Sequence, residues 1–324
     1  MERRKMKKYI GIDIGGTKIA VVKGDASGNI IKKVRFLNDM SPNEAIGRII
    51  DEARALGDAD AVGISCGGPL DSKKGLILSP PNLPGWDSIP ITQILGDALG
   101  IPAFLQNDAD ACALAEWKFG AGKGADNMIF LTFGTGMGAG LILNGQLYSG
   151  STGSGGEVGH VRLQPFGPVG YGKAGSFEGF ASGSGIAQLG KIAATEMLQR
   201  GNTVGYCQSL DELDNVTAQT VARAAKDGDE TAIEVYRLCG EMLGMGLSIL
   251  IDILNPERII LGSIYARSGE LLESSMRKVL EREALTQAYA CCQILPAALG
   301  ESLGDVAAIS VAVNGLNNAE GEKL

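Results

Sequence analysis

Asn107 and Asp108 stand where an apolar segment gives way to a helical one. Residues 102–105 (PAFL) are typical of a short buried strand, and the pattern of residues 109–119 predicts a helix. A carboxamide and a carboxylate therefore lie side by side at the carboxyl end of a strand, where open α/β sheets bind ligands. This position makes Asp108 a candidate general base. The competing interpretation is that Asn107 or Asp108 only caps the helix, since both residue types are favoured caps.

Two glycine-rich turns have the composition of anion-binding loops. Gly15-Gly16-Thr17 follows a strand of alternating isoleucines, and residues 134–140 (GTGMGAG) follow the apolar run 128–133. Glycine lets the backbone approach a phosphate closely, and the N–H groups of such a turn suit an anion. The second turn resembles the dinucleotide-binding pattern G-x-G-x-x-G. It leads into a strand instead of a helix, which argues against a Rossmann site.

Each glycine turn belongs to a longer pattern that occurs twice. Strand, turn, strand, turn and strand follow one another in residues 9–36 and again in residues 128–148. Two copies of one meander predict two related domains that face each other and that each offer a phosphate-binding turn. A chain of 324 residues is also long enough for about two domains.

Polar residues mark the starts of several predicted helices. Ser41-Pro42-Asn43-Glu44 predicts a capping box, with proline at the first position of a helix that runs to Leu56. Asn215 is predicted to cap a helix that ends at Lys226, and another helix is expected over residues 269–283.

The composition favours a soluble, cytoplasmic α/β protein. Hydrophobic residues make up 45% of the chain, and its 47 glycines are typical of a turn-rich fold. The net charge of −8 argues against a nucleic-acid partner, because phosphate binding needs clustered Lys and Arg. The basic cluster of residues 1–8 is not followed by a continuous apolar segment, so no secretory leader is expected. The longest apolar helical stretch, residues 242–254, is too short to span a membrane.

The cysteines show none of the CxxC spacing that metal sites with cysteine ligands usually have. No zinc site is therefore predicted from their spacing. The thiols are expected to be reduced and mostly buried. The six positions are Cys66, Cys112, Cys207, Cys239, Cys291 and Cys292.

Eight stretches follow one another between residues 10 and 263: GIDIGGTKIAVV, GGPLD, SPPNLPGW, QNDADACALAEW, FGAGKG, LTFGTGMGAG, GEVGH and NPERIILG. In this order they resemble the ROK family (repressors, open reading frames and kinases), which has the actin-like ATPase (ribonuclease H-like) fold. The resemblance implies two α/β domains around a central cleft. The N-terminal domain would span residues 1–118, joined by a C-terminal helix at about 303–324, and the larger C-terminal domain would span residues 119–302.

The resemblance also implies a reaction, namely ATP-dependent transfer of a phosphate to a sugar hydroxyl, with Asp108 accepting the hydroxyl proton. Asp13 would help to hold Mg²⁺ together with the ATP phosphates. The implied sugar-binding positions are Gly68, Asn107, Asp108, Glu157, His160 and Glu178. The implied nucleotide- and phosphate-binding positions are Asp13, Gly15, Gly16, Thr17, Lys18, Gly134, Thr135, Gly136, Gly138, Gly262 and Ser263.

The chain departs from the ROK pattern at a zinc site. Members of the family commonly hold zinc with three cysteines of a CGCGxxGCLE run and with the histidine of GEIGH. Here the cysteine positions are Val169, Tyr171 and Ser176, and only the histidine, His160, is kept. A single histidine cannot hold structural zinc, so a zinc-free protein is expected. Tyr171 or a backbone carbonyl would then have to orient the His160 ring.

The leading hypothesis is a glucokinase-like hexose kinase that acts on the 6-hydroxyl with ATP and Mg²⁺, as a homodimer. N-acetylhexosamine kinase, fructokinase and allose kinase activities stay open, as do other phosphate donors such as ADP or polyphosphate. A sugar-responsive repressor of the same family is disfavoured, because the GIDIGGTK strand begins near residue 10 and leaves no room for a preceding helix-turn-helix domain. A non-sugar actin-like ATPase would not be expected to combine Asn107 and Asp108 with Glu157, His160 and Glu178.

Overall fold

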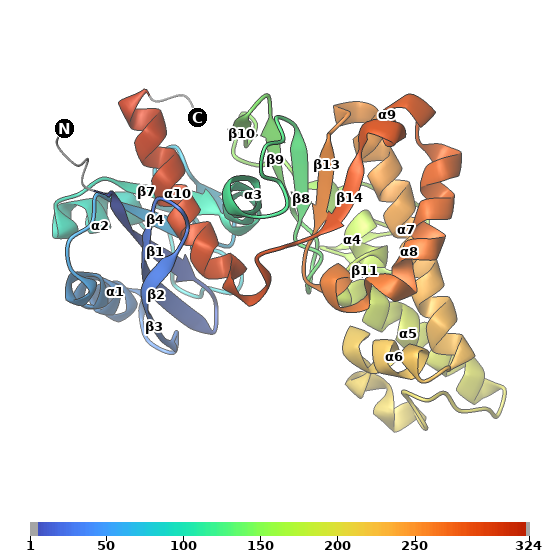
Figure 1. Cartoon of the computed structure of the whole chain (residues 1–324). Helices are drawn as coiled ribbons and strands as arrows, with labels where there is room; N and C mark the ends of the chain where they lie inside the picture. The colour runs from blue at the N-terminus through green and yellow to red at the C-terminus, as the bar shows by residue number, and fades with distance from the viewer. Residues whose placement is uncertain (1–5, 322–324) are drawn as a thin grey trace. The chain divides into compact units, whose positions relative to one another are not determined.

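The computed structural model describes residues 6–321, which form two compact units (Figure 1). The first unit contains the described residues up to Asp126, residues 140–155 and the residues from Ala298 onward. The second unit contains residues 127–139 and 156–297. Residues 1–5 of the basic N-terminal cluster lie outside the described part of the chain.

A five-stranded sheet with the order β3-β2-β1-β4-β7 is the centre of the first unit. The first three strands form an antiparallel meander, and β4 and β7 continue the sheet in parallel with β1. The helices of this unit are α1, α2, α3 and α10, of which α10 comes from the end of the chain. The bounds are β1 Lys8–Ile14, β2 Lys18–Asp25, β3 Ile30–Leu37, α1 Pro42–Leu56, β4 Ala61–Cys66, β5 Leu70–Asp71, β6 Leu76–Ile77, α2 Ile91–Leu99, β7 Ala103–Asn107, α3 Asp108–Phe119 and α10 Leu303–Glu320.

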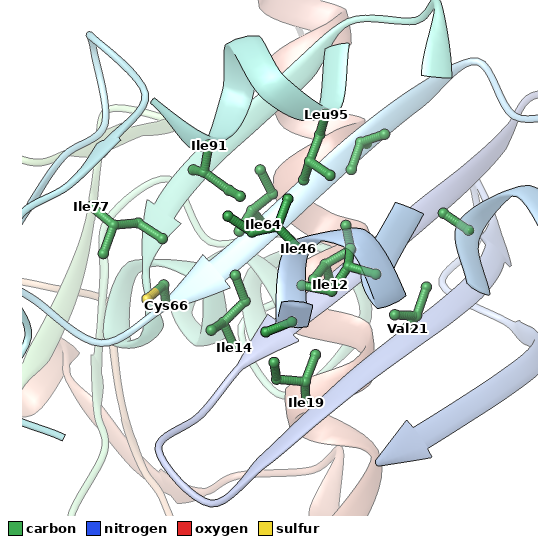
Figure 2. Close-up of a cluster of buried hydrophobic side chains, with 14 of the residues drawn as sticks. Ile12, Ile14, Ile19, Val21, Ile46, Ile64, Cys66, Ile77, Ile91 and Leu95 are labelled. Carbon is green, nitrogen blue, oxygen red and sulfur yellow. The ribbon is translucent and has the colours of Figure 1, made fainter. Parts of the chain in front are cut away.

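The two faces of this sheet have separate hydrophobic clusters. On one face, isoleucines of β1 and β2 pack with side chains of β4, α1 and α2 (Figure 2). On the other face, Tyr9 and Val22 pack against Ile309, Ala312 and Leu316 of α10. Successive side chains of a strand point to opposite faces, so the apolar β1 strand serves both clusters.

Glycines allow α10 to lie directly on the sheet. A Cβ atom on Gly63 of β4 would overlap the Ala308 carbonyl oxygen, and one on Gly11 of β1 would lie 2.9 Å from the Ile309 nitrogen. Real Cβ atoms do not approach other heavy atoms this closely, so the position of α10 depends on both glycines.

The second five-stranded sheet has the order β10-β9-β8-β13-β14. Strands β9 and β10 are antiparallel, whereas β13 runs parallel to both β8 and β14. The strands and the further helices are β8 Met128–Leu131, β9 Ala139–Leu143, β10 Gln146–Tyr148, β11 Val169–Gly170, β12 Lys173–Ala174, α4 Phe177–Phe180, α5 Gly183–Gln199, α6 Ala218–Lys226, α7 Glu230–Leu254, β13 Arg258–Leu261, α8 Ile264–Glu283, α9 Thr286–Cys291 and β14 Gln293–Pro296.

The repeated meander predicted from the sequence is confirmed. In chain order, both five-stranded sheets read third, second, first, fourth and fifth strand, so one topology occurs twice. The capping box of α1 is also confirmed, with the Ser41 side chain accepting from the Glu44 N–H and Glu44 bonding back to Ser41.

Two helix starts differ from the prediction. Thr217 caps α6, because its side chain and that of Thr220 bond reciprocally to each other's backbone N–H groups, whereas Asn215 ends a preceding 3₁₀ turn. Helix α8 begins at Ile264, five residues before the predicted start, and Ser268 interrupts it with non-helical angles (φ −143°, ψ 22°).

All six cysteines are free. No helix within residues 6–321 is both long enough and apolar enough to cross a bilayer.

Candidate active site

Asn107 and Asp108 form the junction between β7 and α3. Asn107 is the N-cap of the helix, and its Oδ1 accepts a hydrogen bond from the Ala109 N–H at 2.8 Å. The Oδ1 of Asp108 accepts from the same N–H, also at 2.8 Å. Asn107 therefore does cap the helix. A cap uses one oxygen of a side chain, so capping does not exclude a second role in ligand binding.

Asp108 is exposed at the surface, although dense protein surrounds it. Partial loss of water around the carboxylate raises the pKa of Asp108 above its ordinary value. The hydrogen bond from Ala109 opposes this effect by stabilising the charged form. A carboxylate that a ligand can reach and that binds protons more readily than usual is suited to general-base chemistry.

Asp13 lies near the carboxyl end of β1, in the same unit as Asp108. Burial, followed by the negative charges of Asp108 and Asp305, raises the pKa of Asp13 to about 6. Lys33 and Arg35 oppose this shift. A partly buried carboxylate beside other carboxylates is a favourable position for a divalent cation, because a cation would remove the repulsion.

The glycine turn of the first unit is held on both sides. The Gly15 N–H donates to the Lys18 carbonyl at 3.1 Å, and the Asn38 side chain donates to the Gly15 carbonyl at 2.8 Å. A Cβ atom on Gly16 would lie 2.5 Å from the Asn82 carbonyl oxygen. Within residues 6–321, the N–H groups of Gly16 and Thr17 donate to no protein acceptor. The turn is therefore ordered, with two N–H groups left for an anion.

Gly68, in the loop after β4, lies next to Asn107. A Cβ atom at this position would be 3.4 Å from the Asn107 Nδ2 atom. The first unit thus brings together Gly68, Asn107 and Asp108, and places Asp13 close enough to interact with Asp108 electrostatically.

The glycine turn of the second unit is built in a similar way. The Gly134 N–H donates to the Gly136 carbonyl at 3.0 Å, and the Gly138 N–H donates to Thr132 Oγ1 at 2.9 Å. The N–H groups of Thr135 and Gly136 have no protein acceptor among the described residues. Phe133, just before the turn, has a left-handed φ of +33°, an uncommon angle for a bulky residue that is often associated with functional sites.

Glu178 supports this second turn, a contact that sequence reasoning did not predict. Its Oε2 atom accepts from the Met137 N–H at 2.9 Å, and a Cβ atom on Gly136 would lie 2.7 Å from the same oxygen. Glu178 belongs to the first turn of α4, and the Ser176 side chain caps that helix. The carboxylate therefore links a predicted sugar-binding position to a predicted phosphate-binding turn.

Glu157 and His160 both lie at the surface of the second unit, at a short 3₁₀ turn over Val158–His160. The His160 ring meets the Tyr171 ring edge to face, with 6.4 Å between ring centroids and 77° between planes. Contacts of this geometry stabilise the orientation of both rings. Tyr171 is therefore one of the two partners that the sequence suggested for His160.

The second unit has a cavity of about 810 Å³ whose lining includes Ile264, the residue that follows the Gly262-Ser263 turn in the sequence. The Arg267 guanidinium donates to Ser263 Oγ at 3.0 Å, and Ser263 has a left-handed φ of +37°. Tyr236 and Arg223 also line the cavity. No sequence motif marked Arg223 or Tyr236, because they come from α6 and α7 and join Arg267 only after folding.

The similarity of this chain to known proteins decides its family. The ROK family matches residues 9–314, nearly the whole chain. The chain belongs to the ROK family. The glucokinase of Thermotoga maritima is 31% identical, over 94% of this chain and 96% of that protein. A xylose repressor of Caldicellulosiruptor bescii is 29% identical, over 86% of this chain and 72% of the repressor.

A solved ROK family glucokinase from Streptomyces griseus, in complex with glucose and AMPPNP, has the same fold. It is 31% identical and has a TM-score of 0.74, with 94% of this chain and 99% of that chain covered. The predicted fold class, an actin-like ATPase fold made of α/β units, is confirmed.

The ROK zinc positions of this chain hold no thiol, and protein contacts occupy them. Ser176 is fully buried, accepts from the Gly179 N–H at 3.1 Å and donates to the Gly170 carbonyl. Gln188 bonds both the N–H and the carbonyl of Val169, each at 2.9 Å. No group of three or more His, Cys, Asp or Glu residues within 6–321 is arranged to hold a metal. These side chains do not fit structural zinc.

Proposed function

We propose that this chain is a sugar kinase that transfers the γ-phosphate of ATP to a hexose hydroxyl, most simply the 6-hydroxyl of glucose. The observation that carries the proposal is Asp108, a reachable carboxylate with a raised pKa beside Asn107 at a helix N-terminus. Similarity also supports the proposal, because this ROK chain is 31% identical to a glucokinase over nearly its full length.

In the proposed reaction, Asp108 accepts the proton of the attacking hydroxyl as its oxygen bonds to the γ-phosphorus. The bond between that phosphorus and the bridging oxygen breaks, and ADP leaves with the electron pair. Asn107 donates from its Nδ2 group to a neighbouring sugar hydroxyl, because its Oδ1 is already engaged in the helix cap. Phosphoryl transfer requires mainly positioning and charge neutralisation, which these groups supply.

The phosphates would bind to the free N–H groups of the two glycine turns, Gly15–Lys18 in the first unit and Gly134–Gly138 in the second. Gly262 and Ser263 would hold adenosine, together with the cavity lined by Arg267, which bonds Ser263. Mg²⁺ bound to the phosphates would neutralise developing charge. Asp13 would hold the ion through water. The Asp13 carboxylate is partly buried and is repelled by the charges of Asp108 and Asp305, and a cation would offset this repulsion.

The remaining sugar contacts are assigned by the family resemblance. Glu157, His160 and Glu178 of the second unit would bind hydroxyls of the sugar, and Gly68 would line the pocket beside Asn107. Carboxylates accept two hydrogen bonds each from vicinal hydroxyls, so this set suits a polyhydroxylated ring. It does not by itself select glucose over N-acetylhexosamines, fructose or allose.

A sugar-responsive regulator is the alternative function within the family. The similarity favours the kinase, because the glucokinase is 31% identical over 94% of this chain and the repressor 29% identical over 86% of it. We also propose that the protein acts as a cytoplasmic homodimer, which light scattering coupled to size-exclusion chromatography would test.

The deciding experiment measures ADP release from ATP and Mg²⁺ with a panel of hexoses, N-acetylhexosamines and ketohexoses. We expect stimulation by at least one hexose, with glucose the strongest. Polyphosphate and ADP are included as alternative donors. If no sugar raises ADP formation above the rate without sugar, the kinase proposal is wrong and the regulator becomes the better reading.

A further inference from the structure

A polar cavity of about 860 Å³ lies in the first unit, away from the proposed catalytic residues. It is bounded by the loop after β5, the end of β7, the β9–β10 hairpin and the last turns of α10. A second cavity, of about 530 Å³, shares Lys73, Gln106, Asn314 and Asn318 with it and continues along β7. All these residues belong to the same unit, so the cavity needs no contribution from the other one.

The opposite end of α10 approaches Asp13, because a Cβ atom on Gly304 would lie 3.2 Å from Asp13 Oδ2. At 1.5 Å per helical residue, Asn314 and Asn318 are about 15 Å and about 21 Å further along the helix axis. The cavity is therefore distinct from the position of Asp13. Gln106 precedes Asn107 in β7, and neighbouring side chains of a strand point to opposite faces.

Gln106, Asn314 and Asn318 are three of the residues with side-chain amides that line this cavity. Within the described residues, the amides of Gln106, Asn314 and Asn318 make no hydrogen bond to protein. Asn314 and Asn318 are one turn apart on α10 and therefore share a face of the helix. Each amide offers both donors and acceptors, as a sugar hydroxyl does, so paired hydroxyls and amides can satisfy one another fully.

The hairpin strand β10 adds an aromatic surface and an anchored hydroxyl. Tyr148 lines the cavity and is 51% exposed, so its ring is available to pack against the apolar face of a ligand. Ser149 Oγ donates to Asp110 Oδ2 at 2.7 Å, which ties the end of the hairpin to the first turn of α3. The oxygen of Ser149 keeps the capacity to accept a hydrogen bond.

The charge of the lining is close to balanced. The larger cavity contains one cationic side chain, Lys73, and one carboxylate, Asp126. Lys74, which lines only the second cavity, forms an ion pair with Asp71 at 3.2 Å. An anionic ligand would need an excess of positive charge, so the balance favours a neutral ligand.

We infer that this cavity is a second carbohydrate-binding site, which takes a neutral hexose or disaccharide through the three amides and the Tyr148 ring. The inference rests on contacts within the first unit and not on the proposed kinase reaction. A free sugar and the end of a longer glycan would offer the same ring and hydroxyl chemistry, so the test uses probes of both sizes.

The test is isothermal titration of the full chain, without nucleotide, with glucose, with maltose and, as an anionic probe, with glucose 6-phosphate. The variant Asn314→Ala/Asn318→Ala removes two amides, and Asn317→Ala on the same helix, outside the cavity lining, is the matched control. We expect a binding event of at least one probe to weaken about tenfold or more in the double variant and to stay unchanged in the control. Tyr148→Ser, on a different element, should weaken the same event.

Thermal unfolding first confirms that each variant is folded, and ADP release should be unchanged in all three. Wild-type binding of both sugars by the double variant and by Tyr148→Ser would overturn the inference. The inference would also be overturned if the variants lost binding of glucose 6-phosphate but kept binding of glucose and maltose, since the site would then select an anion. The outcome is independent of the kinase test, because sugar binding at the cavity can be lost in these variants even if no sugar stimulates ADP release.

Discussion

Asp108 differs from an ordinary helix-capping aspartate because it is reachable and yet has a raised pKa. Asp108→Asn keeps the size of the side chain and the oxygen that accepts from Ala109, but an amide cannot take a proton from a hydroxyl. We expect kcat to fall by about 10²- to 10⁴-fold, the usual contribution of a general base, with little change in the KM for the sugar. Steady-state ADP release with the preferred hexose measures both constants.

Asp229 provides the matched control, since its side chain accepts from the Ala232 N–H at 2.8 Å at the start of α7. Asp229→Asn should retain the kcat of the wild type. If Asp108→Asn keeps more than a tenth of the wild-type kcat, Asp108 is a helix-start residue and not the base.

The charged carboxylate of Asp13 is expected to lower the stability of the folded chain, although it serves the proposed reaction. Its pKa is raised to about 6 in the folded chain, above an unfolded value near 4, so the folded state binds the proton more tightly. Stability therefore falls as the pH rises from about 4 to about 6, and the deficit remains at pH 7. Asp13→Asn should raise the free energy of unfolding by about 1–3 kcal/mol at pH 7.5, and by about half as much at pH 5.

Urea unfolding at the two pH values, in EDTA so that no divalent cation binds, measures this difference. The same substitution should reduce ADP release. Asp97→Asn, on the exposed side of α2, is the control and should alter neither quantity. Equal stabilisation at pH 5 and pH 7.5 would show that ionisation of Asp13 is not the cause.

At the level of the elements, the packing of α10 on the first sheet depends on Gly63. A methyl group on Gly63 would overlap backbone atoms of Ala308 and Ala312, which cannot rotate away as a side chain can. Gly63→Ala should therefore destabilise the chain by about 3 kcal/mol or more, at or above the upper range for overpacking. Chemical denaturation gives the free energy of unfolding.

Gly47, in the middle of α1, is a matched glycine with nothing within 4 Å of the added carbon. Gly47→Ala should raise stability by up to about 1 kcal/mol, since alanine is the better helix former. A small effect of Gly63→Ala, similar in size to that of Gly47→Ala, would mean that α10 does not lie against β4 as described.

Elements whose signals are local could be predicted from the sequence, and those decided by distant contacts could not. The Ser41–Glu44 capping box was predicted because its partners are three residues apart. The prediction that Asn215 caps α6 was wrong, because Asn215 and Thr217 are both residue types that cap helices and lie two positions apart. The reciprocal bonds of Thr217 with Thr220 show that Thr217 is the cap. The bond from Met137 to Glu178 joins residues 41 positions apart, so no pattern in the sequence indicates it.

At the scale of the whole molecule, the two similar sheets were predictable because the sequence repeats the meander. The expectation that helix α10 belongs with the N-terminal domain came from the family resemblance alone, and no pattern of residues indicated it. Its contacts with β1 and β4 connect residues near 10 and 63 to residues near 309, beyond the range of local periodicity. The cavity beside Asn314 had no signal at all, since its lining comes from five separate stretches of the chain.

We expect the chain to fold without zinc, and removal of metal can test this expectation. In this ROK chain, backbone and side-chain hydrogen bonds hold the segment from Val161 to Phe177, including the bond from the Phe177 N–H to the Val161 carbonyl at 2.7 Å. A structural zinc site contributes folding free energy directly, so its removal lowers the melting temperature. We therefore expect EDTA to leave the melting temperature unchanged, and elemental analysis to find far less than one zinc per chain.

The substitutions that restore the family's ligand set provide the opposite control. Val169→Cys, Tyr171→Cys and Ser176→Cys, combined in one chain, would give three thiolates near His160 along the sequence. Three thiolates and one imidazole complete a tetrahedral zinc set, so this variant should retain about one zinc and lose stability in EDTA. A wild-type chain that also retains zinc, or that melts at a lower temperature in EDTA, would show that other residues hold the metal. The hydrogen bonds of Ser176 and Val169 would then not be sufficient to keep this loop folded.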